Sequence, residues 1–497
     1  MNAERARLLL RAALVTVVLA VLAHTQADPD LWGHIRFGRD IIESRAIPSL
    51  DPYSFTSDRA WVNHEWLAEC VMYLAYAAGG PPGLVVLKMT LVGMMLAGVV
   101  VALRRFETRG RLDVLLGTVT ILTLPQSINL RPQLFSMALF SWLLALLLSA
   151  GRSRRPLAVL AAVPVLILWV NAHGGWIIGI GTLGLWSGFG LLTDRPLREK
   201  GLTLLAALGA IVGTLANPYG WLLWSFLGET VRFGRVGITE WQPIFRAPTP
   251  IVPVLWAVVA ILGLRAVVRS ARARSLDLQS VAVVVAWGAA SFAVTRLLAF
   301  FAIATVILLG SNLFAPTTPA SEPRQARPDP RLVVLGATAA AVLVMAGSLF
   351  QAVSSARCIR IDSSVFPEPG AVRWALDRRL RGNMLTWFNW GEYTIWYLAP
   401  GIKVSMDGRR ETVYSADTIQ RYEQLFDSRV SDRREILQSL QPDYIWLPRG
   451  LELTKFLQSE GWVPLFSGSR SAVLGRGPAT EAIQDTSAPP ARCFPGP

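Results

Sequence analysis

Residues 8–38 read LLLRAALVTVVLAVLAHTQADPDLWGHIRFG, a mostly apolar segment that runs directly into an acidic turn and an amphipathic stretch. The apolar part, 8–27, has the length that an α-helix needs to cross a lipid bilayer. Basic residues before it resemble a signal peptide, but the polar end and the many apolar segments that follow favour an uncleaved first helix. The stretch therefore predicts a helix that leaves the membrane at an acidic turn.

Apolar segments of similar length recur along the rest of the chain. Only 16% of the 497 residues are charged and 52% are hydrophobic, whereas about a quarter of the residues in soluble proteins are charged. This composition excludes an ordinary soluble enzyme and a disordered protein. It predicts a polytopic α-helical membrane protein with about 11 transmembrane helices, at 8–27, 83–103, 112–128, 132–150, 157–171, 174–193, 202–216, 250–268, 279–295, 297–314 and 331–351.

The formal charge of +14 comes mainly from arginines in short segments between the apolar blocks. Cytoplasmic loops of membrane proteins collect Lys and Arg, so this pattern reports topology rather than nucleic-acid binding. With the N-terminus in the cytoplasm, the inside segments hold about 20 basic residues and the outside connections about nine. We therefore expect a cytoplasmic N-terminus and an extracytoplasmic region from about residue 355 onward.

Two regions differ from the membrane-spanning pattern. Within the transmembrane part, 1–354, the first extracytoplasmic loop, 28–82, predicts two interfacial helices, at 30–45 and 61–78. The C-terminal part, 355–476, alternates short helical and strand patterns, which predicts an extracytoplasmic α/β domain. Its expected helices are 368–381, 391–399, 415–428, 433–440 and 451–459, and its expected strands are 383–388, 402–406, 443–447 and two near 462–475.

The tail, 477–497, is rich in Pro, Ala and Ser, and we expect it to be disordered. Cys358 and Cys493 flank the C-terminal domain on the side of the membrane that we expect to be oxidising. A disulfide between them is one hypothesis that the sequence raises.

The acidic turn is the first candidate site. Asp28 and Asp30 can supply a general base, and Asp28, Asp30 and His34 can bind a divalent metal, because Asp30 and His34 are four residues apart and share a helical face. The alternative is structural, since an aspartate at this position can cap the helix that follows.

These residues carry a resemblance to a known superfamily. The string Asp28-Pro-Asp-Leu-Trp-Gly-His-Ile-Arg-Phe-Gly38, the later Trp61-Val-Asn-His-Glu-Trp66 and the overall layout resemble the GT-C membrane glycosyltransferases, in the branch of protein O-mannosyltransferases, aminoarabinose transferases and RgtA/B/C/D-like proteins. The resemblance implies a sugar donor carried on polyprenyl phosphate, and an extracytoplasmic glycan, lipid or protein as acceptor. It implies inversion at the anomeric carbon, with Asp30 or Asp28 as the base, in a bacterial inner membrane.

Such a site needs cations for the lipid phosphate. Arg131, Arg246 and Arg296 lie at expected outer helix ends, where a guanidinium can bind a phosphate with two hydrogen bonds or simply reach the interface. Further candidates for substrate binding are His64 and Glu65, which are also possible metal ligands; His173, in a Gly-rich helix break; and Asp407 and Arg409, at a strand end. The alternative for the last two is a structural turn held by an Asp–Arg pair.

Two other functions remain open at this stage. A transporter or flippase of a lipid-linked substrate predicts polar residues spread through the middle of the membrane. A non-catalytic envelope assembly protein predicts a binding role for the α/β domain. Because the polar residues gather on the expected outer side, the sequence favours surface chemistry and hence the glycosyltransferase.

Overall fold

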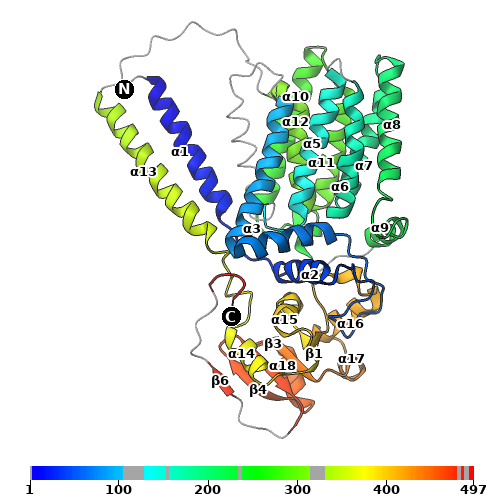
Figure 1. Cartoon of the computed structure of the whole chain (residues 1–497), viewed down its shortest axis with the longest axis vertical. Coiled ribbons are helices and arrows are strands. Elements are labelled where there is room, and N and C mark those ends of the chain that lie inside the picture. Colours follow the sequence, from blue (N-terminus) through cyan, green and yellow to red (C-terminus); the bar gives the residue numbers. More distant parts are fainter. Residues whose placement is uncertain are drawn as a thin grey trace. The chain divides into compact units, whose positions relative to one another are not determined.

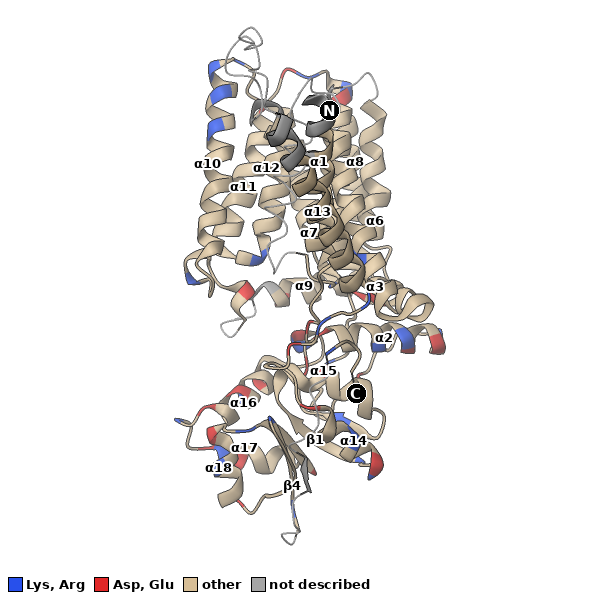
Figure 2. Cartoon of the chain, turned by 90° about the vertical axis from the view of Figure 1, so that its left-hand side faces the viewer, with Lys and Arg blue, Asp and Glu red and all other residues tan. Residues whose placement is uncertain are grey.

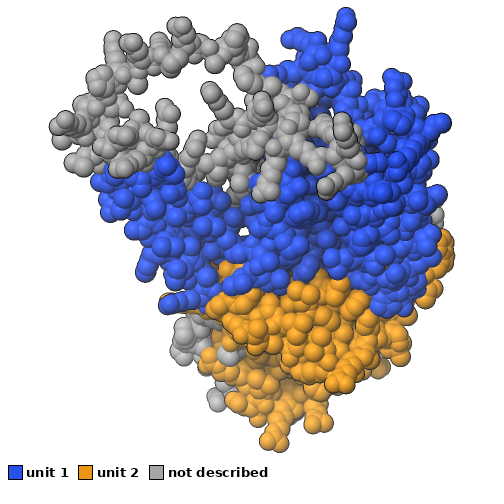
Figure 3. All heavy atoms as spheres, turned by 45° about the horizontal axis from the view of Figure 1, so that its top comes forward, with its two compact units in different colours: residues 1–24, 86–220, 234–357 blue, residues 25–85, 221–233, 358–497 orange. Residues whose placement is uncertain are grey.

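The computed structural model describes residues 3–103, 128–152, 156–232, 238–313, 331–477, 483–485 and 492–496. The chain divides into two compact units, coloured separately in Figure 3. Unit 1 comprises residues 1–24, 86–220 and 234–357, and unit 2 comprises residues 25–85, 221–233 and 358–497. This division differs from the predicted one, because the first loop belongs with the C-terminal region rather than with the membrane helices.

All regular secondary structure in the described part of unit 1 is helical. Its helices are the end of α3 (Trp66–Leu103), together with α1 (Ala3–Ala23), α5 (Gln133–Arg152), η1 (Pro156–Ala161), α6 (Ala162–Ala172), α7 (Trp176–Leu191), α8 (Leu197–Gly213), η2 (Thr239–Trp241), η3 (Ile244–Arg246), α10 (Ile251–Arg272), α11 (Leu278–Ala293), η4 (Thr295–Leu297), α12 (Leu298–Leu313) and α13 (Arg331–Ala356). Figure 2 shows these helices with few charged residues along their length. The third expected span, 112–128, falls almost wholly outside the described residues.

Apolar residues cover both the inside and the outside of this unit. Every described side chain of α12 from Leu298 to Gly310 is buried, and the helix packs against α5, α10 and α11. By contrast, α1 and α13 pack on each other (Figure 1), and only 11% of the apolar window of α13 is buried. An exposed apolar surface of this kind matches a lipid environment.

Four described helices are long and apolar enough to cross a membrane: Trp66–Leu103, Gln133–Ala150, Ile251–Arg272 and Thr338–Ala356. Shorter apolar helices cover Pro156–Ala172, Trp176–Leu191, Leu278–Ala293 and Thr295–Gly310. α3 contains a break at Gly80, whose φ of 58° lies in the left-handed region that favours glycine. This break, followed by Pro81 and Pro82, separates the expected interfacial helix from the expected span.

Unit 2 combines helices with one mixed sheet. Its helices are α2 (Leu31–Ser44), the start of α3, α9 (Leu222–Arg232), α14 (Pro369–Asp377), η5 (Phe388–Trp390), α15 (Gly391–Leu398), η6 (Arg410–Thr412), α16 (Ala416–Phe426), α17 (Arg433–Leu440) and α18 (Glu452–Ser459). Its strands are β1 (Gly382–Thr386), β2 (Ile402–Val404), β3 (Tyr444–Pro448), β4 (Val463–Gly468), β5 (Ser471–Gly475) and β6 (Ile483–Asp485). Every helix and strand predicted for 368–475 is present, with ends shifted by a few residues.

The sheet has the strand order β2-β1-β3-β5-β4-β6. β1 pairs in parallel with β2 and β3, β5 is antiparallel to β3 and β4, and β6 is parallel to β4. Figure 1 shows helices packed around this sheet. One hydrophobic core joins Leu385 and Ile445 of the sheet to Phe37, Tyr53 and Trp61 of the first loop. This shared core explains why the first loop belongs to unit 2.

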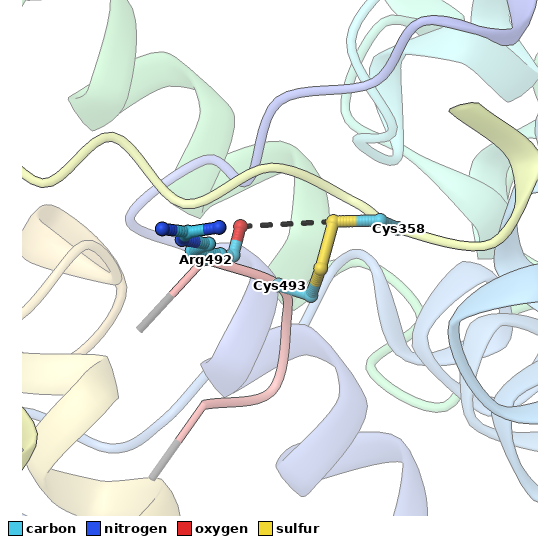
Figure 4. Close-up of a disulfide and its surroundings, with 3 residues drawn as sticks. All are labelled: Cys358, Arg492 and Cys493. Atoms are coloured by element: carbon cyan, nitrogen blue, oxygen red, sulfur yellow. Dashed lines mark hydrogen bonds between the residues drawn. A yellow bond between two sulfur atoms is a disulfide. The ribbon is translucent and has the colours of Figure 1, made fainter. Parts of the chain in front are cut away.

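The disulfide that the sequence raised as a hypothesis is present, and it holds residues 492–496, which lie in the tail that we expected to be disordered. Cys358 and Cys493 are bonded (Figure 4), and backbone hydrogen bonds run from Phe494 N to Ile359 O and from Ile361 N to Arg492 O. The Phe494 ring is buried against Trp32, 5.0 Å between ring centres. Part of the polar tail is therefore held by a covalent bond and an aromatic anchor that composition does not reveal.

Candidate functional site

The loop residues Asp407 and Arg409 lie inside unit 2. The Arg409 guanidinium donates to both carboxylate oxygens of Asp51, at 2.6 and 3.0 Å, and to both of Asp407, at 2.9 and 2.7 Å. The Tyr414 hydroxyl donates to the same Asp407 carboxylate at 2.8 Å. Burial alone would raise the pKa of Asp407, but the neighbouring Arg409 charge holds it below its usual value.

Aromatic rings enclose this ion pair. The Arg409 guanidinium lies 4.9, 5.3 and 4.8 Å from the ring centres of Phe37, Tyr53 and Trp61, which come from α2 and the loop after it. A guanidinium over aromatic faces gains cation–π attraction in addition to its hydrogen bonds. The contacts of Asp407 and Arg409 thus match the structural alternative of an Asp–Arg turn, which ties the first loop to the C-terminal region.

Asp30 lies at the start of α2, and its side chain makes no capping hydrogen bond to that helix. The Asp28 carboxylate accepts a hydrogen bond from the Asp30 N–H at 3.1 Å, so Asp28 stabilises the turn. Asp28 is 8% exposed, and Asp30 is more open to solvent. Of the two aspartates that the sequence left open, Asp28 is thus bonded within the turn and Asp30 is the more exposed.

A second carboxyl group, from Glu392 of α15, lies beside Asp30. A methyl group added at Gly408 would overlap Asp30 Oδ1 and come within 2.8 Å of Glu392 Oε1, so both carboxyl groups face Gly408. Gly33 is needed for the same reason, because a methyl group there would overlap the Glu392 carboxyl. Glu392 is 3% exposed, and its Oε2 atom has no hydrogen-bond partner among the residues that the structure describes.

The environment of Glu392 favours its protonated form. Burial raises the pKa of Glu392 well above its usual value, and the negative charges of Asp30 and Asp407 raise it further. Arg409 opposes this shift, but its donors already serve Asp51 and Asp407. Sequence reasoning missed Glu392, which lies in the string Asn389-Trp-Gly-Glu-Tyr393.

His34, on the next turn of α2, meets two further carboxylates. Its Nδ1 atom lies 3.2 Å from Glu69 Oε1 and 3.9 Å from Glu65 Oε2, and Asn63 donates to Glu69 at 2.6 Å. Burial lowers the pKa of His34, but the hydrogen bond with Glu69 and the surrounding carboxylates outweigh it and raise the pKa. His64 Nε2 lies 3.5 Å from Glu65 Oε1 on the other side.

Among the described residues, His34, Glu65 and Glu69 form the group with metal-ligating geometry, since one ligand atom of each lies within 4.8 Å of the others. Asp28 and Asp30, the other two residues of the expected set, do not belong to this group. The Asp30 carboxylate lies against Gly408, whereas His34 contacts Glu69 of α3. Glu69 was missed, although it lies one helical turn after Glu65.

In unit 1, two of the three predicted arginines share one acidic partner. Arg131 Nη1 donates to Glu240 Oε1 at 2.7 Å, and Arg296 Nη1 lies 3.9 Å from Glu240 Oε2. These residues come from the turn before α5, from η2 and from η4. Arg246, at the end of η3, is exposed and lies over the Phe245 ring at 5.9 Å.

His173 ends α6 in a fixed orientation. Its Nδ1 atom accepts a hydrogen bond from the Gly175 N–H at 2.9 Å and pairs with the Ser136 hydroxyl at 2.7 Å, which in turn accepts from Trp169 Nε1. Because a backbone N–H can only donate, Nδ1 is an acceptor and the ring proton is on Nε2. His173 is therefore a neutral imidazole in this arrangement. In the same unit, Lys88 is 3% exposed and donates to the His24 carbonyl at 2.9 Å.

No family model and no curated protein matches this sequence. Solved structures do match, at low identity. The archaeal oligosaccharyltransferase AglB from Archaeoglobus fulgidus is 10% identical with a TM-score of 0.59, over 90% of this chain and 70% of AglB. ArnT from Cupriavidus metallidurans, bound to undecaprenyl phosphate, is 14% identical with a TM-score of 0.51, over 96% of this chain and all of ArnT (100%).

A third similar structure is the arabinofuranosyltransferase AftD from Mycobacteria, which is 14% identical with a TM-score of 0.53. The match covers 97% of this chain and 40% of AftD. AglB, ArnT and AftD are all GT-C superfamily membrane glycosyltransferases, and this chain shares their fold. The predicted resemblance is thus confirmed for the fold.

Proposed function

We propose that this protein is an inverting glycosyltransferase that moves a sugar from a polyprenyl-phosphate donor to an extracytoplasmic glycan, lipid or protein. The ligands of the similar structures support this donor class, since AglB was solved with a dolichol-phosphate and an inhibitory peptide, and ArnT with undecaprenyl phosphate. The observation that carries the proposal is the Asp30 carboxylate, which does not cap its own helix and faces Gly408 beside Glu392.

Asp30 is the proposed general base. It takes the proton of the acceptor hydroxyl as the acceptor oxygen attacks the anomeric carbon from the side opposite the phosphate. The bond from the anomeric carbon to the phosphate oxygen breaks, and the lipid phosphate leaves with the electron pair. Asp28, whose carboxylate holds the turn, positions Asp30 and does not itself react.

Arg131 and Arg296 are the proposed phosphate ligands. Two guanidinium groups that meet at one carboxylate are spaced to bind one anion, and charged N–H donors stabilise the developing charge on a leaving phosphate. Arg246, exposed over Phe245, has a peripheral role in this scheme. His173, whose Nδ1 atom contacts Gly175 and Ser136, is a further proposed substrate-binding residue.

His34, Glu65 and Glu69 are the proposed ligands of a divalent cation. One imidazole nitrogen with carboxylate oxygens suits zinc or manganese, and one ligand atom from each of the three residues lies within 4.8 Å of the others. Two carboxylates facing one imidazole also leave negative charge for a cation to neutralise. A bound cation would add positive charge near the reacting groups, and Asn63 would orient Glu69.

The proposed location is a bacterial inner membrane, with the N-terminus in the cytoplasm and unit 2 outside it. The arginines in the last turn of α10, Arg269 and Arg272, fit the cytoplasmic side in this orientation. A disulfide in unit 2 fits an oxidising compartment. A reporter fused near residue 360 should be active only outside the cytoplasm, and cytoplasmic activity there would contradict the orientation.

The test of the proposed function uses the purified full-length protein with polyprenyl-phosphate pentose and hexose donors. Asp30→Asn should lower sugar transfer by about 10²–10⁴-fold and leave donor binding nearly unchanged. Asp377→Asn, at an exposed end of α14, is the matched control. Full transfer by Asp30→Asn would show that Asp30 is not the base.

A wild-type protein that transfers no sugar from any such donor would overturn the enzyme proposal. Movement of labelled lipid-linked substrate across proteoliposomes would then identify a transporter or flippase. If neither transfer nor movement is found, an envelope assembly role takes its place.

A further inference from the structure

Glu240 lies between the two arginines assigned to the donor phosphate. Its Oε1 atom accepts from Arg131 Nη1 at 2.7 Å, and its Oε2 atom lies 3.9 Å from Arg296 Nη1. The side chains of Arg131, Arg296 and Glu240 are 19%, 25% and 21% exposed, so a solute anion can reach them. The Glu240 carboxylate thus accepts a hydrogen bond from one arginine and lies at ion-pair distance from the other, where a phosphate would bind.

Arg296 is held in place without Glu240. Its Nε atom donates to Gln133 Oε1 at 3.0 Å, and its guanidinium lies over the Trp241 ring at 5.7 Å. The turn that carries it is fixed by Thr295, whose N–H and hydroxyl both donate to the Gln242 carbonyl, at 3.1 and 2.7 Å. Loss of the Glu240 charge would therefore leave Arg296 positioned to bind an anion.

The backbone of Arg131 is fixed at the start of α5. Its N–H donates to the Asn129 carbonyl at 2.9 Å, and its carbonyl accepts from the Leu134 N–H at 3.0 Å as α5 begins. The two arginines and Glu240 together carry a formal charge of +1, and neutralising Glu240 would raise this to +2. Carboxylate and phosphate compete for the same guanidinium N–H groups, because both accept paired hydrogen bonds from arginine.

In the proposed reaction, the phosphate carries more negative charge after sugar transfer than before it. The donor is a phosphodiester with one negative charge, and cleavage of its sugar–oxygen bond yields a phosphate monoester that approaches two charges near neutral pH. The proton released by the acceptor goes to the base, so the arginines meet a more negative ligand after the reaction than before it. Two uncontested arginines would therefore hold the product more tightly than the donor.

We propose that Glu240 is a built-in competitor of the lipid phosphate, which returns to Arg131 and Arg296 as the product leaves. This inference rests on the proposed function for the identity of the ligand. The inference does not depend on which sugar is transferred. Glu240 occupies the anion site formed by Arg131 and Arg296, and removal of its charge should strengthen anion binding at that site.

The experiment measures binding of undecaprenyl phosphate to the full-length protein in detergent, for the wild type and Glu240→Gln. We expect Glu240→Gln to bind about tenfold more tightly at low salt, with a smaller gain at high salt. Arg131→Gln and Arg296→Gln should each weaken binding. The matched control is Glu229→Gln, which neutralises a different carboxylate, one paired with Arg59 in unit 2, and it should leave binding unchanged.

Equal or weaker binding by Glu240→Gln would overturn the inference, because Glu240 would then support the arginines rather than compete with the ligand. Inorganic pyrophosphate serves as a second probe without a lipid chain, and failure of Glu240→Gln to bind either probe also overturns it. If the wild type transfers sugar and Glu240→Gln binds undecaprenyl phosphate no more tightly than the wild type, the inference is wrong and the proposed function stands. If Glu240→Gln binds undecaprenyl phosphate more tightly but the wild type transfers no sugar, the proposed function is wrong and the competition between Glu240 and the anion is supported.

Discussion

Arg409 and Asp51 form a two-bond ion pair across a sequence separation of 358 residues. The pair is enclosed by Phe37, Tyr53 and Trp61, and Arg409 also binds Asp407. Breaking a buried pair from one side leaves an uncompensated charge, which is more costly than the pair itself is stabilising. The contact therefore controls whether the first loop stays folded on the C-terminal region.

Arg409→Met should destabilise unit 2 by about 3–5 kcal/mol, because Asp51 and Asp407 would remain buried without their cation. Arg409→Lys should rescue only part of this loss, since an ammonium cannot donate two parallel bonds to each carboxylate. Thermal unfolding of the purified protein measures the effect. Arg429→Met, which removes an exposed Asp427 partner, is the control and should not shift the transition. A small effect of Arg409→Met would argue against a structural role.

Glu392→Gln should stabilise the protein, and more so as the pH rises. The pKa of Glu392 is raised in the folded state, so folding favours the protonated acid, and wild-type stability falls as the pH rises above its unfolded value of 4.5. Glutamine keeps the shape without the charge, and the gain should reach about 1–3 kcal/mol once the wild-type acid ionises. Melting curves at pH 5 and pH 8 check this.

At pH 5 the wild type and Glu392→Gln should melt at similar temperatures, and at pH 8 the variant should melt higher. A variant that is less stable at both values would show that the Glu392 carboxylate is needed in its charged form.

Replacing Cys358 and Cys493 by serine should lower the stability of unit 2 by about 2–5 kcal/mol, because the bond closes a long loop. Phe494 would then lose the covalent anchor that keeps it beside Trp32. Gel mobility with and without reductant, together with thermal unfolding, provides the measurement. Cys70→Ala is the control, since Cys70 is a free buried thiol, and it should keep the mobility shift.

Gly408→Ala should reduce sugar transfer by about tenfold or more, because its methyl group would displace the Asp30 carboxylate from the geometry a base requires. Protein yield should fall less, since the clash involves side-chain ends. Gly93→Ala, which meets nothing within 4 Å, should behave as wild type. Unimpaired transfer by Gly408→Ala would place the base elsewhere.

The sequence predicted most local features of this fold correctly. The elements of 368–475 follow from the alternation of short apolar strands with amphipathic helices, and the outcome for β3 and α17 differs from the prediction by about one residue or none. The two helices of the first loop follow from the spacing of apolar residues in α2 and from the prolines after Gly80, although the second helix begins at Trp66 rather than at the expected residue 61. These signals are local, so a single sequence contains them.

Partnerships between distant segments could not be predicted in this way. Asp28, Asp30 and His34 are close in sequence. Asp28 and Asp30 lie in the turn before α2, whereas the His34 side chain lies beside those of Glu65 and Glu69. The pairing of Arg131 with Arg296 through Glu240 likewise depends on three separate segments. Glu392 is a single acidic residue among aromatic neighbours, and only the fold brings it to Gly408.

Because the first loop and the sheet share one core, the first loop cannot finish folding until the sheet has been translated. At about 5–20 residues per second, the 358 residues between Asp51 and Arg409 take about 20–70 seconds to translate. Throughout that interval Phe37, Tyr53 and Trp61 have no sheet to pack against, and their apolar rings are open to proteases and to other chains. A ribosome that stops before Cys358 releases a chain with this surface uncovered. Cellular quality control can thus recognise an unfinished copy by its earliest loop.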